Sequence, residues 1–176
     1  MNADPVAQLR EWWEAERVPM VVATAGADGQ PSARAVVLEQ LDERGLVFWS
    51  SSESPKGEQL AANPRVALVF LWDGRQARVE GRVERLSDEE DARHWAAREG
   101  KRQLAAFRQS APVADRAELD RLLAAVPDEP PRPAFWVGYR VVPELFDFWV
   151  AAADFVHDRF RYTRSDGGWT STRLQP

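Results

Sequence analysis

The chain has 176 residues, enough for one domain with a sizeable core, and its 44% hydrophobic and 29% charged residues are typical of a soluble globular protein. A net charge of −5 argues against nucleic acid as a partner, and the lack of cysteine excludes disulfides and thiolate chemistry. The only histidines are His94 and His157, so no metal site is expected. No apolar run approaches the roughly 20 residues of a membrane span, and the N-terminus does not resemble a secretory signal. We therefore predict a cytoplasmic protein without membrane contact.

The first half of the chain predicts one helix followed by short strands. Asp4 is a suitable N-cap and Pro5 a favoured first helical residue, and the apolar spacing extends this helix over 5–17. Tight turns separate the later apolar runs, which predicts hairpins and an antiparallel barrel or sandwich rather than a βαβ fold. The expected strands are 20–25, 32–38, 46–50, 66–72 and 75–85, with a short helix over 57–62 before the fourth.

The second half begins with helices and ends with strands. Ser87 and Glu90 have the capping-box spacing, and the helical region is predicted to continue to about Phe107. A second helix is expected over 115–126, and the proline-rich segment 127–133 is predicted to be a stiff connector. The remaining strands are expected over 135–142, 145–150, 160–164 and 169–174. The whole pattern is mainly β with flanking helices, in one domain over 1–176.

The stretch from Arg34 to Gly57 carries the clearest chemical signal. It reads RAVVLEQLDERGLVFWSSSESPKG, with Arg34 in one strand, hydroxyls at the end of the next strand, and Lys56 at the start of a helix. Helix N-termini favour anions and lysine adds a full charge, so this pattern is that of a phosphate cradle. An ordinary hairpin with a serine-rich turn fits the same spacing, and the spacing alone leaves both open.

Several motifs together resemble the pyridoxamine 5'-phosphate oxidase family. Residues 34–39 resemble its R-x-V-L-L-K, and residues 48–57 resemble its F-Y-T-N-x-x-S-x-K-G. Near the C-terminus FWVGYRVVPELFDFW, HDRFRYTR and GWTSTRLQP resemble its remaining motifs, so the resemblance covers nearly the whole chain. It implies an antiparallel split β-barrel of the FMN-binding type and a homodimer, with 127–176 as the dimerisation segment. It also implies hydride transfer to flavin N5 and reoxidation by oxygen.

The resemblance assigns the FMN contacts to both chains of the dimer. Arg159 and His157 would be catalytic, Arg159 because a cation near the reduced ring stabilises its negative charge. Without the resemblance, Trp149 would be a core residue and Arg159 a surface ion pair. Pro55 replaces a basic residue that many family members have. The cofactor contacts implied for one chain are Arg34, Val36, Val37, Leu38, Trp49, Ser50, Lys56 and Gln76, and those implied for the other chain are Gln109, Ser110, Trp149 and Arg159.

The substrate positions of the family are altered in this chain. Glu39 stands where a phosphate-binding lysine is expected, and Phe155 stands where a ring-covering arginine is expected. His94, Arg98 and Arg102 recur every four residues, so one helix face is predicted to carry them. That face either binds an anion or is a solvated basic face paired with Glu90 and Asp91. The implied substrate-binding set is Glu39, His94, Arg98, Arg102, Phe155 and His157.

The ending of the chain also resembles the flavin oxidases of phenazine biosynthesis. It reads RYTRSDGGWTSTRLQP, and those oxidases also lack lysine at the position of Glu39, although Phe155 is unusual for both branches. We therefore expect an FMN-dependent oxidase for a phenazine-like or other aromatic donor, with weak or no oxidation of pyridoxamine 5'-phosphate. The alternatives are an authentic pyridoxamine or pyridoxine 5'-phosphate oxidase, a flavin-binding protein without turnover, and a structural dimer with an empty site.

Overall fold

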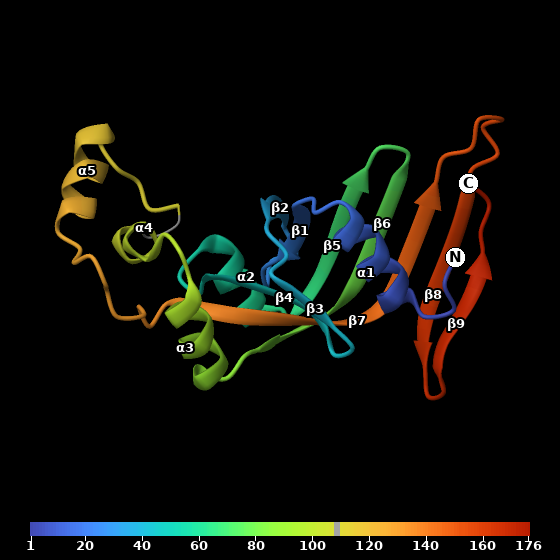
Figure 1. Ribbon diagram of the computed structural model, residues 1–176, viewed down its shortest axis with the longest axis horizontal. Helices are drawn as coiled ribbons and strands as arrows, with labels where there is room; N and C mark the ends of the chain where they lie inside the picture. The colour runs from blue at the N-terminus through green and yellow to red at the C-terminus, as the bar shows by residue number, and fades with distance from the viewer. Residues whose placement is uncertain (108–109) are drawn as a thin grey trace.

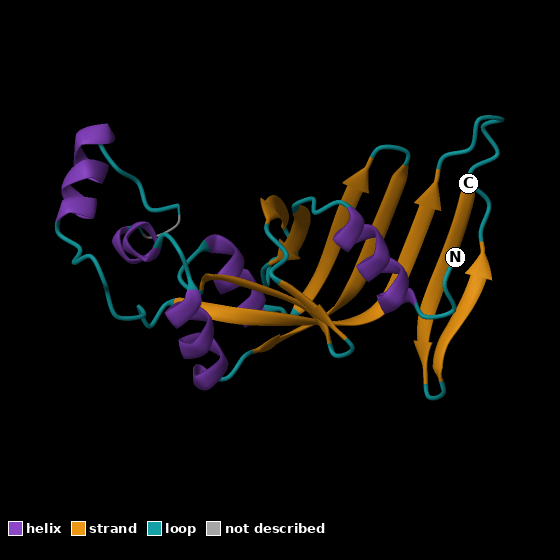
Figure 2. Cartoon of the chain, in the orientation of Figure 1, coloured by secondary structure: helices purple, strands orange, loops and turns teal. Residues whose placement is uncertain are grey.

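The computed structural model describes residues 1–107 and 110–176, and it is mainly an antiparallel sheet with flanking helices (Figures 1 and 2). This agrees with the predicted fold class. The helices are α1 (Pro5–Ala15), α2 (Pro55–Ala62), α3 (Asp88–Ala97), α4 (Lys101–Ala106) and α5 (Arg116–Ala124). The strands are β1 (Met20–Ala25), β2 (Pro31–Val36), β3 (Gln40–Asp42), β4 (Gly45–Ser51), β5 (Arg65–Trp72), β6 (Arg75–Arg85), β7 (Trp136–Val150), β8 (Asp158–Ser165) and β9 (Gly168–Arg173).

The long strand β7 organises the sheet. The strand order is β2-β1-β5-β6-β7-β4-β3, and every pair is antiparallel. Along its other edge, β7 pairs first with β4, where Val141 lies opposite Leu46, and then with β8, where Leu145 lies opposite Thr163. The sheet therefore divides at β7. The first part of β7 pairs with β4, and its last part pairs with β8, which with β9 extends the sheet away from β1 to β6 (Figure 1).

The predicted break between 135–142 and 145–150 is wrong, because β7 continues through Pro143. Proline lacks a backbone N–H and normally interrupts a ladder. Here the register with β6 shifts between Glu80 and Gly81, which absorbs the proline as a β-bulge. Gly81 is required there, since a Cβ would lie 2.2 Å from the carbonyl oxygen of Val142.

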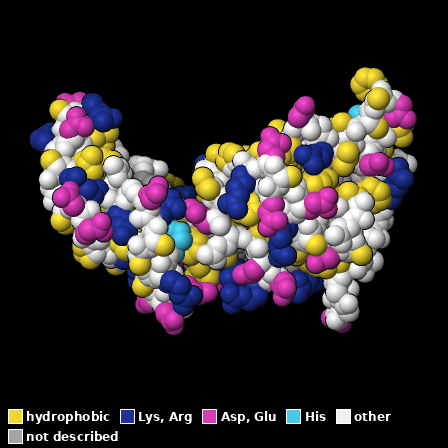
Figure 3. Space-filling model, in the orientation of Figure 1, with side chains coloured by type: hydrophobic (Ala, Val, Ile, Leu, Met, Phe, Trp, Pro, Cys, Tyr) yellow, Lys and Arg dark blue, Asp and Glu magenta, His cyan; other side chains and the backbone are white. Residues whose placement is uncertain are grey.

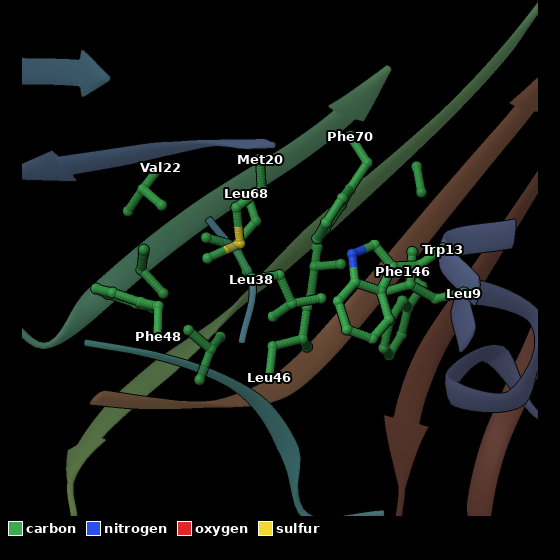
Figure 4. Packing of buried hydrophobic residues seen from close by; sticks show 14 of the residues in the cluster. Leu9, Trp13, Met20, Val22, Leu38, Leu46, Phe48, Leu68, Phe70 and Phe146 are labelled. Carbon is green, nitrogen blue, oxygen red and sulfur yellow. The ribbon is translucent and has the colours of Figure 1, made fainter. Parts of the chain in front are cut away.

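A single large cluster of apolar side chains fills the space between the sheet and α1 (Figure 4). Asp4 caps α1 by accepting a hydrogen bond from the N–H of Val6 at 2.9 Å, as predicted. Trp12 of α1 meets the rings of Trp72 and Phe148 edge-on, at centroid distances of 5.6 and 5.3 Å. Helix α1 thereby ties the start of the chain to β5 and to the far end of β7.

The predicted continuous helix from Ser87 to about Phe107 is also wrong. The capping box of Ser87 and Glu90 is present, but α3 ends at Ala97 with Arg98 as an extended C-cap. Gly100 has φ of 68°, a conformation that breaks the helix, and α4 starts at the next residue. Helices α4 and α5 form an arm away from the sheet, with a hollow between the arm and the body (Figures 1 and 3). Across the described residues, no helix combines the length and apolar character needed to cross a membrane.

Candidate functional site

Two cations lie close together beside the N-terminus of α2. Lys56 is buried in the first turn, and its Nζ donates to the Ser54 hydroxyl at 3.0 Å. Arg34 reaches from β2 to the same helix, where its Nη2 is 3.4 Å from Oε1 of Gln59, and it donates to the hydroxyl of Thr24 at 2.7 Å. The sequence predicted this pairing of Arg34 and Lys56 at a helix start.

The electrostatics of this pair favour an anion. Burial, followed by repulsion from the Arg34 charge, lowers the pKa of Lys56 from 10.5 to about 8. Burial also lowers the pKa of Arg34. Both shifts mean that the surrounding protein disfavours the charged forms of Lys56 and Arg34. An anion bound here would stabilise these charged forms. The helix N-terminus adds a positive partial charge, so these residues fit the phosphate group of FMN.

The other cofactor positions predicted on this side differ in exposure. Leu38 is a core residue, Val36 packs against the core, and Val37 is 62% exposed. Ser50 is buried near the end of β4. Only Val37 of these side chains therefore presents a large surface to a ligand.

A cavity of about 450 Å³ lies next to Val37, and Glu39, His94 and Arg98 line it. Nη1 of Arg98 forms a hydrogen-bonded ion pair with the carboxylate of Glu39. Nε2 of His94 lies 4.0 Å from the same carboxylate. The structure thus brings together three of the predicted substrate residues. The carboxylate of Glu39 forms an ion pair with Arg98.

The imidazole of His94 is held by a ring stack, and its buried Nδ1 has no hydrogen-bond partner among the described residues. It lies flat on the indole of Trp49, with centroids 3.6 Å apart and planes within 3°. The indole N–H of Trp49 donates to the buried carboxylate of Asp91 at 2.9 Å. The same carboxylate accepts a hydrogen bond from the N–H of Gly138 at 2.7 Å. Burial lowers the pKa of His94, and Arg98 adds to this while Glu39 and Asp91 oppose it. The N–H of Trp49 thus positions this stack, and the predicted contact of Trp49 with the cofactor stays a prediction.

The predicted helix face of His94, Arg98 and Arg102 does not exist. Arg98 is the C-cap of α3 and Arg102 lies on α4, so the glycine break separates them. Arg102 forms an ion pair with Asp128 at 3.1 Å and donates to the carbonyl of Leu123 at 3.2 Å, which attaches α4 to α5. The alternative pairing of this face with Glu90 and Asp91 is wrong as well, since the arginines use Glu39 and Asp128.

A second group of predicted residues forms a row across β6, β7 and β8. Gln76 lies opposite Trp149, and Trp149 lies opposite Arg159, so the three side chains share one face of the sheet. Arg159 binds both oxygens of the buried Asp147, at 2.9 and 3.0 Å, and Arg161 binds the same carboxylate at 2.7 Å. Burial acts to raise the pKa of Asp147, but hydrogen bonds from the two arginines lower it below its usual value. Arg159 is therefore fixed as a cation.

The loop between β7 and β8 places His157 and Phe155 beside this row. The His157 ring lies 4.7 Å from the Trp149 ring, and its Nδ1 accepts a hydrogen bond from the N–H of Ala152 at 3.1 Å. Phe155 is 83% exposed and has φ of 62°, an uncommon conformation for a bulky residue. An exposed phenylalanine held this way is an apolar contact surface.

One chain does not bring the two groups together. Trp49 is opposite Gly138 at the start of β7, whereas Trp149 is near its end, a separation of about 35 Å along an extended strand. Ser110 lies in the loop between α4 and α5 with φ of 68°, and Gln109 lies outside the described residues. Within one chain, the predicted site residues therefore form two separate halves.

The sequence analysis did not predict several residues that hold the side chains of these two halves. Gln59 and Thr24 hold Arg34, Asp91 holds Trp49, and Asp147 holds Arg159. Of these, only Asp147 had a signal, because it stands two residues before Trp149 in a strand otherwise rich in apolar residues. The others act through contacts distant in sequence, which spacing does not reveal.

Comparison with known proteins gives matches over nearly the whole chain. The family model described as Pyridoxamine 5'-phosphate oxidase matches residues 6–129, and the Pyridoxine 5'-phosphate oxidase C-terminal dimerisation region matches residues 136–176. Pyridoxine/pyridoxamine 5'-phosphate oxidases from Rubrobacter xylanophilus and Bordetella petrii are 44% and 45% identical to it. Those alignments cover 99% of this chain and 88% and 90% of the respective relatives.

Solved structures match equally widely. PhzG from Burkholderia lata 383, in complex with tetrahydrophenazine-1-carboxylic acid, is 32% identical with a TM-score of 0.89, covering 99% of this chain and 94% of PhzG. A pyridoxamine 5'-phosphate oxidase-related, FMN binding protein from Nostoc punctiforme has a TM-score of 0.81 at 17% identity, with both chains fully covered. The latter likeness shows the fold alone. The chain is thus similar both to oxidases of vitamin B6 phosphates and to PhzG.

Proposed function

Because the chain belongs to the pyridoxamine 5'-phosphate oxidase family, we propose that it is an FMN-dependent oxidase for an aromatic, phenazine-like donor that carries no phosphate. FMN, when bound, supplies a hydride acceptor at N5 for a donor C–H beside an amine or hydroxyl, and oxygen takes up the electrons as hydrogen peroxide. The part of the protein is to bind both partners, to orient the donor carbon and to exclude water.

The observation that carries the cofactor assignment is the pair of Arg34 and Lys56 at the start of α2. Burial, followed by repulsion from Arg34, lowers the pKa of Lys56 to about 8, so a bound phosphate group relieves an unfavourable interaction. Each charge-assisted hydrogen bond to such a group contributes about 1.5–3 kcal/mol. The loss of a basic residue at Pro55 is compatible with this site, because Lys56 lies in the first turn of α2 and Arg34 contacts Gln59 of the same helix.

The observation that carries the substrate assignment is the charge of the cavity beside Val37. Glu39 and Arg98 cancel each other, and burial keeps the pKa of His94 low, so the cavity has no net positive charge near neutral pH. Arg102 does not compensate, because Asp128 binds it. Phe155 adds an exposed apolar ring to the other half of the site. This combination suits a flat aromatic donor better than a dianionic phosphate ester.

The division of the site along β7 supports a homodimer in which each flavin contacts two chains. Residues 136–176 match a dimerisation region and contain Trp149, His157 and Arg159. We propose that these residues reach the flavin held by Arg34 and Lys56 of the other chain. In that position the cation of Arg159 stabilises negative charge on the reduced ring, and His157 covers the donor. One domain over 1–176, with 127–176 as its dimerisation segment, and a cytoplasmic location stay predictions.

The second candidate is an authentic pyridoxine/pyridoxamine 5'-phosphate oxidase. It is favoured by relatives of that name at 44% and 45% identity, compared with 32% for PhzG. Arg98 and His157 are also retained at the implied substrate positions. A flavin-binding protein without turnover is the third possibility, and only activity measurements separate it from the first two.

The test uses the purified protein loaded with FMN. We expect anaerobic bleaching of the flavin by reduced phenazine carboxylic acids, with hydrogen peroxide released on admission of air. Pyridoxamine 5'-phosphate should give kcat/KM below about 10⁴ M⁻¹s⁻¹, the low end of typical enzymes. Turnover of pyridoxamine 5'-phosphate above that value would establish the second candidate instead. Bleaching by neither donor class, with FMN bound, would leave the flavin-binding protein without turnover.

A further inference from the structure

We propose that Glu39 is a specificity-determining residue whose carboxylate occupies an anion site formed by Arg98, so that this site is intact but masked. This rests on the proposed function, since it concerns the cavity assigned above to the donor. It goes further, because it states that the loss of affinity for a phosphate group comes from one resident counter-ion. The remainder of the anion site is already built.

Both partners of the ion pair are fixed by their backbones. The N–H of Glu39 donates to the carbonyl of Val47 at 3.0 Å, which ties the residue to β4. The N–H of Arg98 donates to the carbonyl of Trp95 at 3.1 Å, and its guanidinium lies 5.8 Å from the centre of the Trp136 ring. Arg98 therefore has two supports that do not depend on Glu39, and its guanidinium should stay in place without the carboxylate.

The pair can be reached from the cavity. The side chains of Arg98 and Glu39 are 28% and 25% exposed, and both line the volume of about 450 Å³. Within the described parts of the chain, Glu39 is the sole acidic side chain that forms an ion pair with Arg98. A guanidinium group binds carboxylates and phosphates through the same parallel N–H donors. An incoming phosphate group must therefore displace the carboxylate of Glu39 and then lie beside its charge.

The test measures anion binding by the FMN-loaded protein, so that flavin already occupies the site of Arg34 and Lys56. The variant is Glu39→Gln, and the matched control is Glu99→Gln, which removes the same charge from an exposed residue lining the same cavity. The probes are inorganic phosphate and pyridoxal 5'-phosphate. We expect Glu39→Gln to bind pyridoxal 5'-phosphate at least about tenfold more tightly than the natural protein, because a charge-assisted contact becomes available. Glu99→Gln should stay within about twofold.

The imidazole of His94 provides a readout independent of turnover. His94 and His157 are the only histidines, so NMR resolves their titrations, and a His157→Gln variant assigns them. Burial lowers the pKa of His94 and Glu39 raises it, so Glu39→Gln should lower that pKa further. Binding of inorganic phosphate at Arg98 should raise it again.

The double variant Glu39→Gln with Arg98→Gln should lose the gained affinity, which places the bound anion on Arg98. If Glu39→Gln folds poorly by circular dichroism, Glu39→Ala removes the same carboxylate and serves in its place. Equal anion affinity in Glu39→Gln and Glu99→Gln, or a gain that survives loss of Arg98, would overturn the inference. These outcomes do not depend on which donor the natural protein oxidises, so they are separable from a failure of the proposed function.

Discussion

The site beside α2 and the cavity beside Val37 both contain arginine, but the neighbours of that arginine differ in charge. Arg34 lies near another cation, whereas Arg98 lies against a carboxylate. At α2, Arg34 adjoins the buried Lys56, whose pKa is lowered to about 8 by burial and then by repulsion from Arg34. In the cavity, Arg98 forms an ion pair with Glu39 and neighbours a histidine whose pKa is lowered by burial. The first arrangement gains from a bound anion, whereas the second already holds one.

This difference shows why counting basic residues is a poor guide to anion binding. A cation next to another cation raises the electrostatic free energy of the free protein, and a ligand releases that energy on binding. A cation in an ion pair must first lose its partner. We therefore expect the two sites to respond to substitution in opposite directions.

The largest effect should follow from removing the cation pair at α2. Arg34→Ala with Lys56→Ala should weaken FMN binding by about 10²–10⁴-fold, because each charge-assisted contact contributes about 1.5–3 kcal/mol. Flavin absorbance after equilibrium dialysis measures the loss. Arg93→Ala is the control, since Arg93 pairs with Glu89 on the exposed face of α3. Full flavin occupancy in the double variant would show that Arg34 and Lys56 do not bind the FMN phosphate.

A smaller effect, in the direction of gain, is expected in the cavity. Glu39→Lys with Phe155→Arg should raise kcat/KM for pyridoxamine 5'-phosphate at least about tenfold, because two cations replace an anion and an apolar ring. Steady-state peroxide release gives the comparison. Glu99→Lys with Phe155→Arg adds the same number of cations without breaking the pair with Arg98, and it should gain less. Similar gains in both double variants would show that overall charge, rather than Glu39, limits the reaction.

The pH dependence of FMN binding should distinguish the same two sites. In the free protein Lys56 loses its proton at about pH 8, and a bound phosphate group favours the protonated form. Affinity for FMN should therefore be constant below about pH 8 and fall by up to about tenfold per pH unit above it. Flavin fluorescence titrations from pH 6.5 to about pH 9.5 test this range. Lys56→Arg keeps its charge throughout and should abolish the dependence; an unchanged slope in that variant would assign it to another group.

The smallest change should appear when two defective chains are mixed. One chain carries Arg34→Ala with Lys56→Ala, and the other carries Arg159→Ala, so each homodimer has two damaged sites. Random exchange gives half mixed dimers with one intact site each, which restores about a quarter of the flavin sites. Steady-state peroxide release after refolding the mixture in excess FMN measures this recovery. Recovery of nothing, or a monomer by light scattering that binds FMN, would contradict a site shared between chains.

The sequence by itself determined the mainly β fold class and the capped starts of α1 and α3, and its motifs singled out Arg34 and Lys56. The caps depend on local spacing: Asp4 and Pro5 start α1, and Ser87 and Glu90 start α3. Arg34 lies in β2 and Lys56 in the first turn of α2. The resemblance of its motifs also identified the family, which the matches over residues 6–129 and 136–176 confirm. Local chemistry and residue type were sufficient for the caps, whereas the resemblance favoured the phosphate cradle over an ordinary hairpin.

Only the tertiary structure decided which charges meet. The four-residue spacing of His94, Arg98 and Arg102 predicted one helix face, but Gly100 breaks the helix and sends Arg102 to Asp128. Glu39 and Arg98 are separated by 59 residues, and Trp49 and Asp91 by 42, so their contacts follow from how β4 and α3 pack. Pro143 inside β7 was likewise accommodated by a bulge in β7 itself, where Glu144 is the extra residue opposite Glu80 and Gly81 of β6. Ion pairs and bulges depend on positions fixed by distant parts of the chain, and periodicity along one segment does not contain that information.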